Sequence, residues 1–83
     1  AIGDFEMILE EHPEVLAYTR TLGEQQLIVL NNFYGRDTVV KLPEYLTRKD
    51  SSILIGNYAD APAMANEIKL RPYETITYSI SAE

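Results

Sequence analysis

The apolar residues of this chain fall in six or seven short runs separated by clusters of Gly, Pro, Asn and Asp. The runs recur about every ten residues, which is the spacing of strands and turns in an all-β sandwich. No segment has the periodicity of a long helix. The pattern therefore predicts an all-β sandwich of about six to eight short strands.

The first run predicts a strand at the edge of a sheet. Phe5, Met7 and Leu9 share one face of it, because side chains in a strand alternate between the two faces. Pro13 follows shortly after and ends the run, since proline cannot donate a hydrogen bond to a neighbouring strand.

The next two runs predict a β-hairpin formed by residues 15–21 and 26–31. Gly23 lies between them and can supply the positive φ that a tight hairpin turn requires. Residues 27–30 are apolar at every position, so we expect both faces of this strand to be covered.

The second half of the chain predicts four further strands, joined by loops. They span residues 38–42, 52–56, 67–70 and 74–80. In the last of them, Ile76, Tyr78 and Ile80 alternate with hydroxyl side chains, as in a strand that covers a core on one side. The alanine-containing connection 57–66 has room for one helical turn.

Composition indicates one small compact domain over residues 1–83. Apolar residues make up 46% of the chain and charged residues 24%. A chain of 83 residues can form a core but has little room for a deep, water-excluding active site, which disfavours an enzyme. With no cysteine, neither disulfides nor thiolate metal sites can form.

The charge of the chain bears on its partners. The net charge is −6, with 13 acidic and 7 basic residues, which argues against nucleic acid and anionic membrane surfaces. No run reaches the ~20 apolar residues of a membrane span, and the N-terminal residues lack a signal-peptide pattern. A cytoplasmic protein is therefore expected.

Candidate chemistry is sparse. Glu6, Glu10, Glu11 and Glu14 lie where a solvated edge is expected, without an apolar pocket that would raise the pKa of a general acid. His12 is the only histidine and lies in a turn. The glycines are scattered singly, and no calcium-binding loop pattern occurs. We expect no catalytic, cofactor-binding or metal-binding residues.

The aromatic residues offer one binding hypothesis. Tyr18 and Tyr78 occupy strand positions and are expected to be core residues with their hydroxyls at the rim. The aromatic residues in or beside loops are Phe33, Tyr34, Tyr45 and Tyr58. Exposed aromatic faces bind sugars, so a carbohydrate-binding module that uses Phe33, Tyr34 and Tyr58 is an alternative function.

The two strands that are apolar throughout indicate a packing interface, because a two-layer sandwich covers only one face of each sheet. The candidate interface residues are Leu27, Val29, Ile53 and Ile55. Their alternates on the opposite faces are Ile28, Leu30 and Leu54. Both sets are apolar, so the sequence does not decide which set faces inward. Loops or strand twist that hide these residues are the other explanation.

Three segments in this order resemble a known family. They are LEEHPEVLAYTR at residues 9–20, LIVLNNF at 27–33 and LRPYE at 70–74. Together they resemble the C-terminal β-domain of bacterial α-glucosidases of the α-amylase superfamily, of the oligo-1,6-glucosidase and trehalose-6-phosphate hydrolase type. Ile2-Gly3-Asp4-Phe5 looks like the junction after the catalytic barrel, whereas residues 58–67 show no clear family pattern.

The resemblance implies an antiparallel Greek-key sandwich that packs on and stabilises the (β/α)₈ barrel of a larger glycosidase, the barrel itself lying outside this chain. The catalytic carboxylates of the family belong to the barrel, so none is assigned here. The implied partner is the barrel of the same parent chain. The isolated domain could also associate with itself, and it would meet α-glucoside oligosaccharides only through the parent enzyme.

Overall fold

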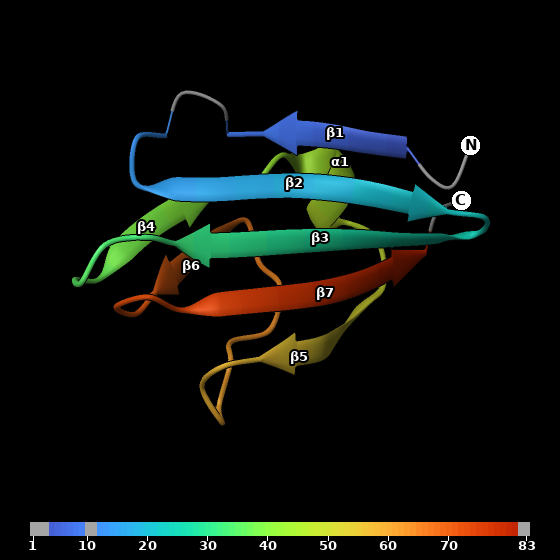
Figure 1. Cartoon of the computed structure of the whole chain (residues 1–83). Coiled ribbons are helices and arrows are strands. Elements are labelled where there is room, and N and C mark those ends of the chain that lie inside the picture. Colours follow the sequence, from blue (N-terminus) through green and yellow to red (C-terminus); the bar gives the residue numbers. More distant parts are fainter. Residues whose placement is uncertain (1–3, 10–11, 82–83) are drawn as a thin grey trace.

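A computed structural model describes residues 4–9 and 12–81, and within this part the chain forms seven strands and one helical turn. The elements are β1 (Asp4–Ile8), β2 (Val15–Leu22), β3 (Gln25–Asn32), β4 (Thr38–Lys41), α1 (Glu44–Thr47), β5 (Ser51–Gly56), β6 (Glu67–Leu70) and β7 (Thr75–Ser81) (Figure 1). This confirms the predicted all-β fold.

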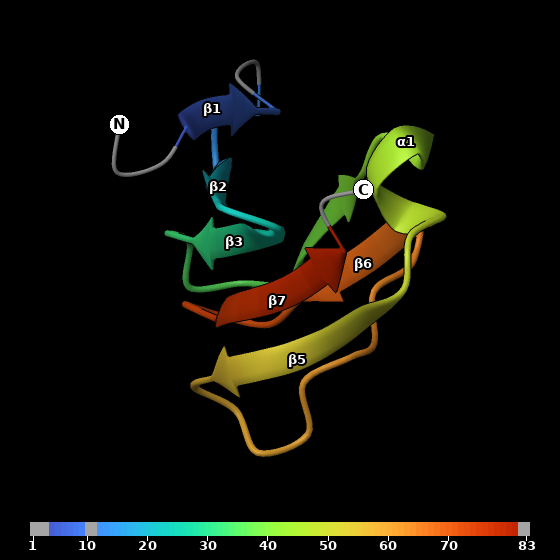
Figure 2. The same ribbon diagram turned by 90° about the vertical axis from the view of Figure 1, so that its right-hand side faces the viewer.

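The strands form two antiparallel sheets. The large sheet has the order β1-β2-β3-β7-β5, and the small sheet pairs β4 with β6. In Figure 2 the large sheet is an arc whose concave side faces β4, β6 and α1. From β3 to β7 every connection passes from one sheet to the other. Such crossovers give the sandwich its Greek-key character.

The core lies between the concave face of the large sheet and the small sheet. Ile28 and Leu30 from β3 are fully buried, as are Ile76 and Tyr78 from β7. The small sheet and α1 contribute Val40, Ile68, Leu70 and Leu46. The alternation predicted for the last strand is confirmed, because its hydroxyl-bearing residues point to the opposite face.

The predicted hairpin is confirmed. Strands β2 and β3 pair from Leu22↔Gln25 onward, and Gly23 in the turn has a φ of 64°. Strand β1 is an edge strand as predicted, since it pairs only with β2. Leu9 does not belong to the strand, however: it lies beyond the end of β1 with a positive φ of 57°.

The helical turn occurs at Glu44–Thr47 and not in the connection 57–66. Pro43 precedes its first residue, a position where the missing N–H of proline has no helical partner to lose. Leu46 fixes the turn in place because its side chain is buried at the end of the core. No helix among the described residues is long and apolar enough to cross a membrane.

The two faces of β3 should respond differently to truncation. Ile28→Ala removes a fully buried side chain and should lower the free energy of unfolding by about 2–5 kcal/mol. Leu27→Ala removes a partly exposed side chain on the other face and should cost about 1 kcal/mol. Urea unfolding followed by circular dichroism measures both. Equal losses would contradict the inward orientation of Ile28.

Candidate functional site

The convex face of the large sheet, here called the outer face, is the face that points away from β4 and β6. On β1, β2 and β3 it carries mostly apolar side chains, which are Phe5, Met7, Leu16, Tyr18, Leu22, Leu27 and Val29. The polar residues on this part of the face are Arg20, Gln25 and Asn31. On β7 it carries Thr75, Thr77, Ser79 and Ser81. The outer face is thus apolar on one side and rich in hydroxyl groups on the other.

The apolar part of the outer face is ordered by contacts between its own side chains. The rings of Phe5 and Tyr18 stack with their centroids 4.7 Å apart and an interplanar angle of 27°. Phe5 nevertheless remains 60% exposed. Exposed apolar side chains gathered on one sheet face are the usual sign of an interaction surface.

Two of the predicted interface residues lie together on this surface. Leu27 and Val29 occupy neighbouring outward positions of β3, and Val29 is opposite Tyr18 in the register with β2. Their alternates Ile28 and Leu30 are fully buried in the core. The structure therefore settles which face of β3 points inward.

The predicted residues of β5 do not join Leu27 and Val29. Ile55 is paired with Thr77 and lies on the outer face, but β7 separates it from β3. Ile53 is paired with Tyr78 and points to the inner side of the edge strand, where it is 40% exposed. Leu54 is exposed at an irregularity of the register.

The expectation for the strand tyrosines was correct for Tyr78 and wrong for Tyr18. Tyr78 is buried, and its hydroxyl donates to the carbonyl of Pro62 at 2.7 Å. Burial, together with the charge of Glu74, raises the pKa of Tyr78 to about 12. Tyr18 lies on the outer face because Ala17 and Thr19, its neighbours, are the residues of β2 that point into the core.

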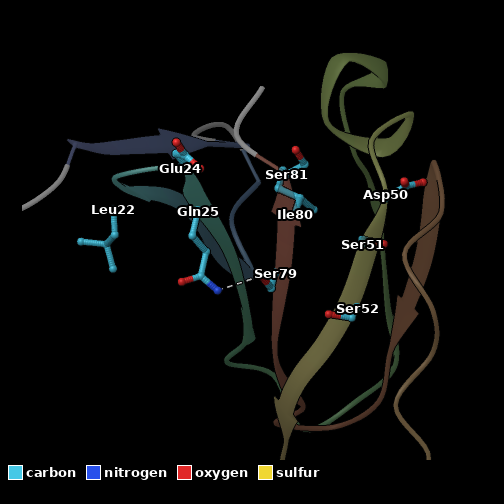
Figure 3. A pocket seen from close by; sticks show the side chains of 9 residues that line it. All are labelled: Leu22, Glu24, Gln25, Asp50, Ser51, Ser52, Ser79, Ile80 and Ser81. Atoms are coloured by element: carbon cyan, nitrogen blue, oxygen red, sulfur yellow. Dashed lines mark hydrogen bonds between the residues drawn. The ribbon is translucent and has the colours of Figure 1, made fainter.

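An open hollow of about 570 Å³ occurs where the β2–β3 turn meets the ends of β5 and β7 (Figure 3). Most of the residues that line it have polar side chains, and the amide of Gln25 donates to the hydroxyl of Ser79 at 3.0 Å. The other lining residues are Leu22, Glu24, Asp50, Ser51, Ser52, Ile80 and Ser81. A hollow this open does not exclude water, so it lacks the low-dielectric setting that acid–base catalysis uses.

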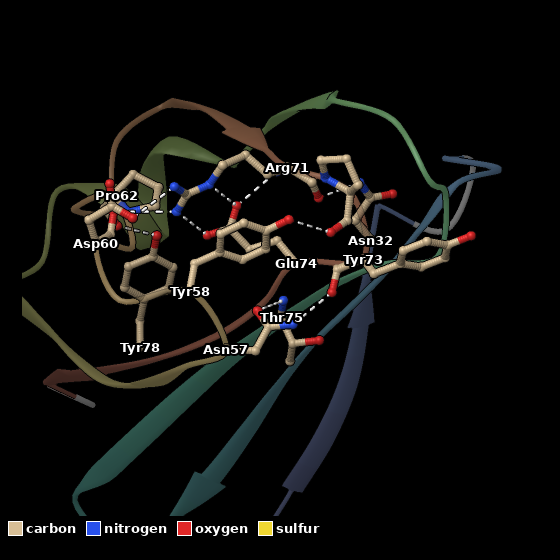
Figure 4. Close-up of polar contacts among 11 residues, drawn as sticks. Asn32, Asn57, Tyr58, Asp60, Pro62, Arg71, Tyr73, Glu74, Thr75 and Tyr78 are labelled. Atoms are coloured by element: carbon tan, nitrogen blue, oxygen red, sulfur yellow. Dashed lines mark hydrogen bonds and ion pairs between the residues drawn. The ribbon is translucent and has the colours of Figure 1, made fainter.

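A charged cluster fixes the turn between β6 and β7 (Figure 4). The guanidinium of Arg71 donates to both carboxylate oxygens of Glu74, at 3.1 and 2.8 Å, and its Nη1 lies 2.8 Å from Oδ1 of Asp60. Arg71 also stacks on the ring of Tyr58 at 4.1 Å. Glu74 is completely buried, so this pair is shielded from solvent on one side.

The cluster shifts the pKa values of its acids. The hydrogen bonds from Arg71 hold the pKa of Glu74 below its ordinary value of 4.5, despite the opposing effect of burial. They also lower the pKa of Asp60 and raise that of Arg71 itself. Both carboxylates are therefore held ionised, which suits a structural ion pair and not a general acid.

Tyr58 is part of this charged cluster. One face of its ring is occupied by Arg71, and its hydroxyl donates to the carbonyl of Pro72 at 2.8 Å. Its predicted role as a free sugar-stacking residue is thus the least supported of the three loop aromatics.

Phe33 and Tyr34 are accessible, and the structure adds a third aromatic residue beside them. Phe33 is 61% exposed and Tyr34 39%. Tyr73 is 62% exposed, and its N–H donates to the carbonyl of Tyr34 at 2.9 Å. These three residues are called the aromatic loop cluster below. Tyr73 is not among the predicted loop aromatics, although it lies between the strands expected at 67–70 and 74–80.

Tyr73 has an unusual backbone conformation. Residues 71–74 form a turn with Pro72 in second position, and the N–H of Glu74 donates to the carbonyl of Arg71 at 3.0 Å. Tyr73, in third position, has a φ of 56°, as in a type II turn. Glycine or asparagine is favoured there, and a bulky side chain costs on the order of 1 kcal/mol.

The remaining predicted residues have structural contacts. The ring of His12 accepts a hydrogen bond from the N–H of Glu14 and contacts the carbonyl of Val39 at 3.2 Å, as a turn histidine would. Glu14 pairs with Arg36, which lowers the pKa of Glu14. Across residues 4–9 and 12–81, no cluster of three or more His, Asp or Glu side chains is arranged to hold a metal ion. Glu10, Glu11 and the junction residues Ile2 and Gly3 lie outside the described residues.

Comparison with known proteins identifies the class to which this sandwich belongs. The profile of the family described as "Alpha-amylase SusG C-terminal domain" matches residues 15–77. The chain belongs to this family of α-amylase C-terminal domains, which confirms the resemblance seen in the sequence.

Individual relatives show which enzymes of this family the chain is similar to. The chain is 43% identical over 79 residues to the oligo-1,6-glucosidase of Parageobacillus thermoglucosidasius, and 41% identical over 78 residues to the palatinase of Erwinia rhapontici. Each match covers 94% of this chain and 14% of the relative. The chain therefore spans about one seventh of the length of these relatives.

A solved structure supports the same assignment. The trehalose-6-phosphate hydrolase of Bacillus licheniformis superposes with a TM-score of 0.83 at 36% identity. The match covers 95% of this chain and 15% of the hydrolase. The sandwich is thus similar to a small part of a larger glycoside hydrolase.

The Arg71 cluster should make stability depend on pH. Because the pKa of Glu74 is lowered in the folded state, its stabilising effect is present above about pH 4.5 and lost as the pH falls through the folded-state pKa. Glu74→Gln should lower the free energy of unfolding at pH 7 by about 1–3 kcal/mol and flatten its decline in acid. Urea unfolding at a series of pH values measures this.

A matched control for this variant is Glu44→Gln, which removes one exposed carboxylate from α1. It should leave the stability at pH 7 nearly unchanged. If both variants declined in acid with the same slope, the buried ion pair would not be the source of the pH dependence.

Proposed function

We propose that this chain is the non-catalytic C-terminal domain of an α-glucosidase, and that its outer face packs against the catalytic barrel and stabilises it. The observation that carries the proposal is the apolar surface formed by β1, β2 and β3 on the side of the large sheet away from the core. The relatives are glycoside hydrolases in which the matched part is a small fraction of the chain. The remaining length of such a relative supplies the surface that would cover this face.

The energetics support docking on a large apolar partner. Leu27, Val29 and Tyr18 are already held in place by the sheet, so burying them costs little further backbone entropy. An apolar side chain buried from full exposure contributes about 1.5–3 kcal/mol, and these three residues contribute less than that because they are already partly covered. A handful of such residues gives an interface of the strength expected between domains of one chain.

We assign no catalytic role to this chain because its enclosed carboxylates are paired with arginines and remain ionised. Glu74 and Glu14, the two most enclosed carboxylates of those described, are paired with arginines and have lowered pKa values. Glycoside hydrolysis needs one carboxyl group that is protonated near neutral pH, together with a second carboxylate across the scissile bond. We therefore assign hydrolysis of α-glucosidic bonds to the parent barrel.

The docking role can be tested in a chimera. This chain would replace the matched segment of the oligo-1,6-glucosidase of P. thermoglucosidasius, which is 43% identical to it. Val29→Asp should cost the chimera about 2–4 kcal/mol of stability, because the carboxylate would be buried without a partner. In the isolated chain the same change should cost less than about 1 kcal/mol.

Val39→Asp is the control, because Val39 is a solvent-accessible strand valine on the small sheet; it is 47% exposed, whereas Val29 is partly buried. It should have a small effect in both the chimera and the isolated chain. Thermal unfolding measures the effect of each substitution in the chimera and in the isolated chain, and glucosidase activity of the chimera shows whether the barrel remains folded. Equal effects of the two substitutions in the chimera would refute docking through the outer face.

The isolated chain is also expected to associate with itself through the uncovered outer face. Sedimentation velocity at increasing concentration should show dimers, and Leu27→Asp should restore the monomer, because a charge on this face opposes its burial. A strict monomer at about 1 mM would show that the face does not drive association at a concentration where even a weak interface would be populated.

A further inference from the structure

The aromatic loop cluster has features that the packing of the sandwich does not require. Tyr73 occupies the one turn position that favours glycine or asparagine, yet its side chain remains 62% exposed. Its ring covers Gly35, where an added Cβ would lie 3.0 Å from the tyrosine hydroxyl. The strained tyrosine thus contributes little to the core, and its exposed ring faces solvent.

The turn that carries Tyr73 is held rigidly. The carbonyl of Tyr73 accepts a hydrogen bond from the side chain of Asn57 at 2.8 Å, and that side chain also accepts from the N–H of Thr75 at 2.9 Å. The side chain of Asn32 donates to the carbonyls of Arg71 and Arg36, both at 2.9 Å. Figure 4 shows the ring of Tyr73 extending away from the Arg71 cluster. These bonds fix the backbone that carries the ring, so binding a ligand there costs little further backbone ordering.

The loop after β3 supplies the other two rings. Phe33 and Tyr34 are adjacent, and the N–H of Phe33 donates to the carbonyl of Glu14 at 3.0 Å. The guanidinium of Arg36 lies 4.7 Å from the centre of the Tyr34 ring. Two loops that are far apart in sequence therefore present three exposed aromatic side chains and a guanidinium at one end of the sandwich.

The composition of this cluster differs from that of the outer face. Residues 33–37 and 71–74 contain no aliphatic Leu, Ile, Val or Met, whereas the outer face is built largely from such residues. Aromatic faces stack on the C–H faces of pyranose rings, while phenol hydroxyls and guanidinium groups bind sugar hydroxyls. This is the chemistry of an oligosaccharide contact and not of an aliphatic protein interface.

We propose that Tyr73, Tyr34 and Phe33 form a binding site for short α-linked gluco-oligosaccharides, separate from the surface that docks on the barrel. The choice of sugar rests on the proposed function, because the relatives are glucosidases by name. The site would hold substrate near the parent enzyme without taking part in hydrolysis. Tyr58 is not part of it, because its hydroxyl is bonded to the carbonyl of Pro72 and its side chain is partly buried beside Arg71. The ring of Tyr34 also has a guanidinium over it, that of Arg36, but Tyr34 remains 39% exposed.

The test uses the isotopically labelled 83-residue chain, titrated with maltotriose and isomaltotriose and followed by amide NMR. A small preformed site should bind with a dissociation constant of about 1 mM, with saturable shifts at residues 33–36 and 73. Tyr73→Asn should weaken binding at least about tenfold, because it removes the ring while asparagine suits the positive φ. The urea midpoint of this variant should equal or exceed that of the parent chain.

Two further variants complete the experiment. Tyr34→Ala should also weaken binding, whereas Tyr45→Ala, which removes an exposed tyrosine from α1, should leave it unchanged. The proposal is overturned if no saturable shifts occur up to about 10 mM sugar, or if they persist in Tyr73→Asn. The chimera with Val29→Asp measures docking without reference to this site, so failure of one proposal is distinguishable from failure of the other.

Discussion

Strand β3 carries apolar side chains on both of its faces, and this constraint determines how the rest of the domain is organised. Its inward residues Ile28 and Leu30 are fully buried in a core to which the small sheet and α1 also contribute buried side chains. The outward residues Leu27 and Val29 are flanked within the sheet by β2 on one side and by the hydroxyl-bearing residues of β7 on the other, and they are only partly buried. Within the described residues this sandwich has no third layer, so nothing in it covers the outward face of β3.

The sequence predicted those parts of the fold where one local pattern is compatible with only one conformation. The alternation in β7 and the glycine in the β2–β3 turn each specify one conformation, and both are present. The inward face of β3 could not be predicted, because residues 27–30 are apolar throughout and a shift of one residue leaves the hydrophobic pattern unchanged. Pairing with β2 and β7 on either side resolves it.

Which aromatic residues are available for binding depends on tertiary contacts, even more than the orientation of β3 does. Tyr58 and Tyr73 both lie in loops and are indistinguishable by sequence position, yet Arg71 covers one ring and leaves the other exposed. The turn that gives Tyr73 its positive φ is held by hydrogen bonds to Tyr34 and Asn57, residues that are distant in the sequence. Sequence reasoning therefore identified that aromatic residues gather in loops, but not which of them are available.

The position of β7 has a consequence for how the domain forms. It is the last of the described strands along the chain, and it lies between β3 and β5 in the large sheet. Until β7 is inserted, the sheet is split, and β3 and β5 each present an open edge and apolar side chains to solvent. Because this pairing joins distant segments, the step is slow compared with closure of the β2–β3 hairpin. During synthesis on the ribosome, the large sheet therefore remains incomplete until β7 has emerged, and before that point its open edges and apolar faces favour aggregation.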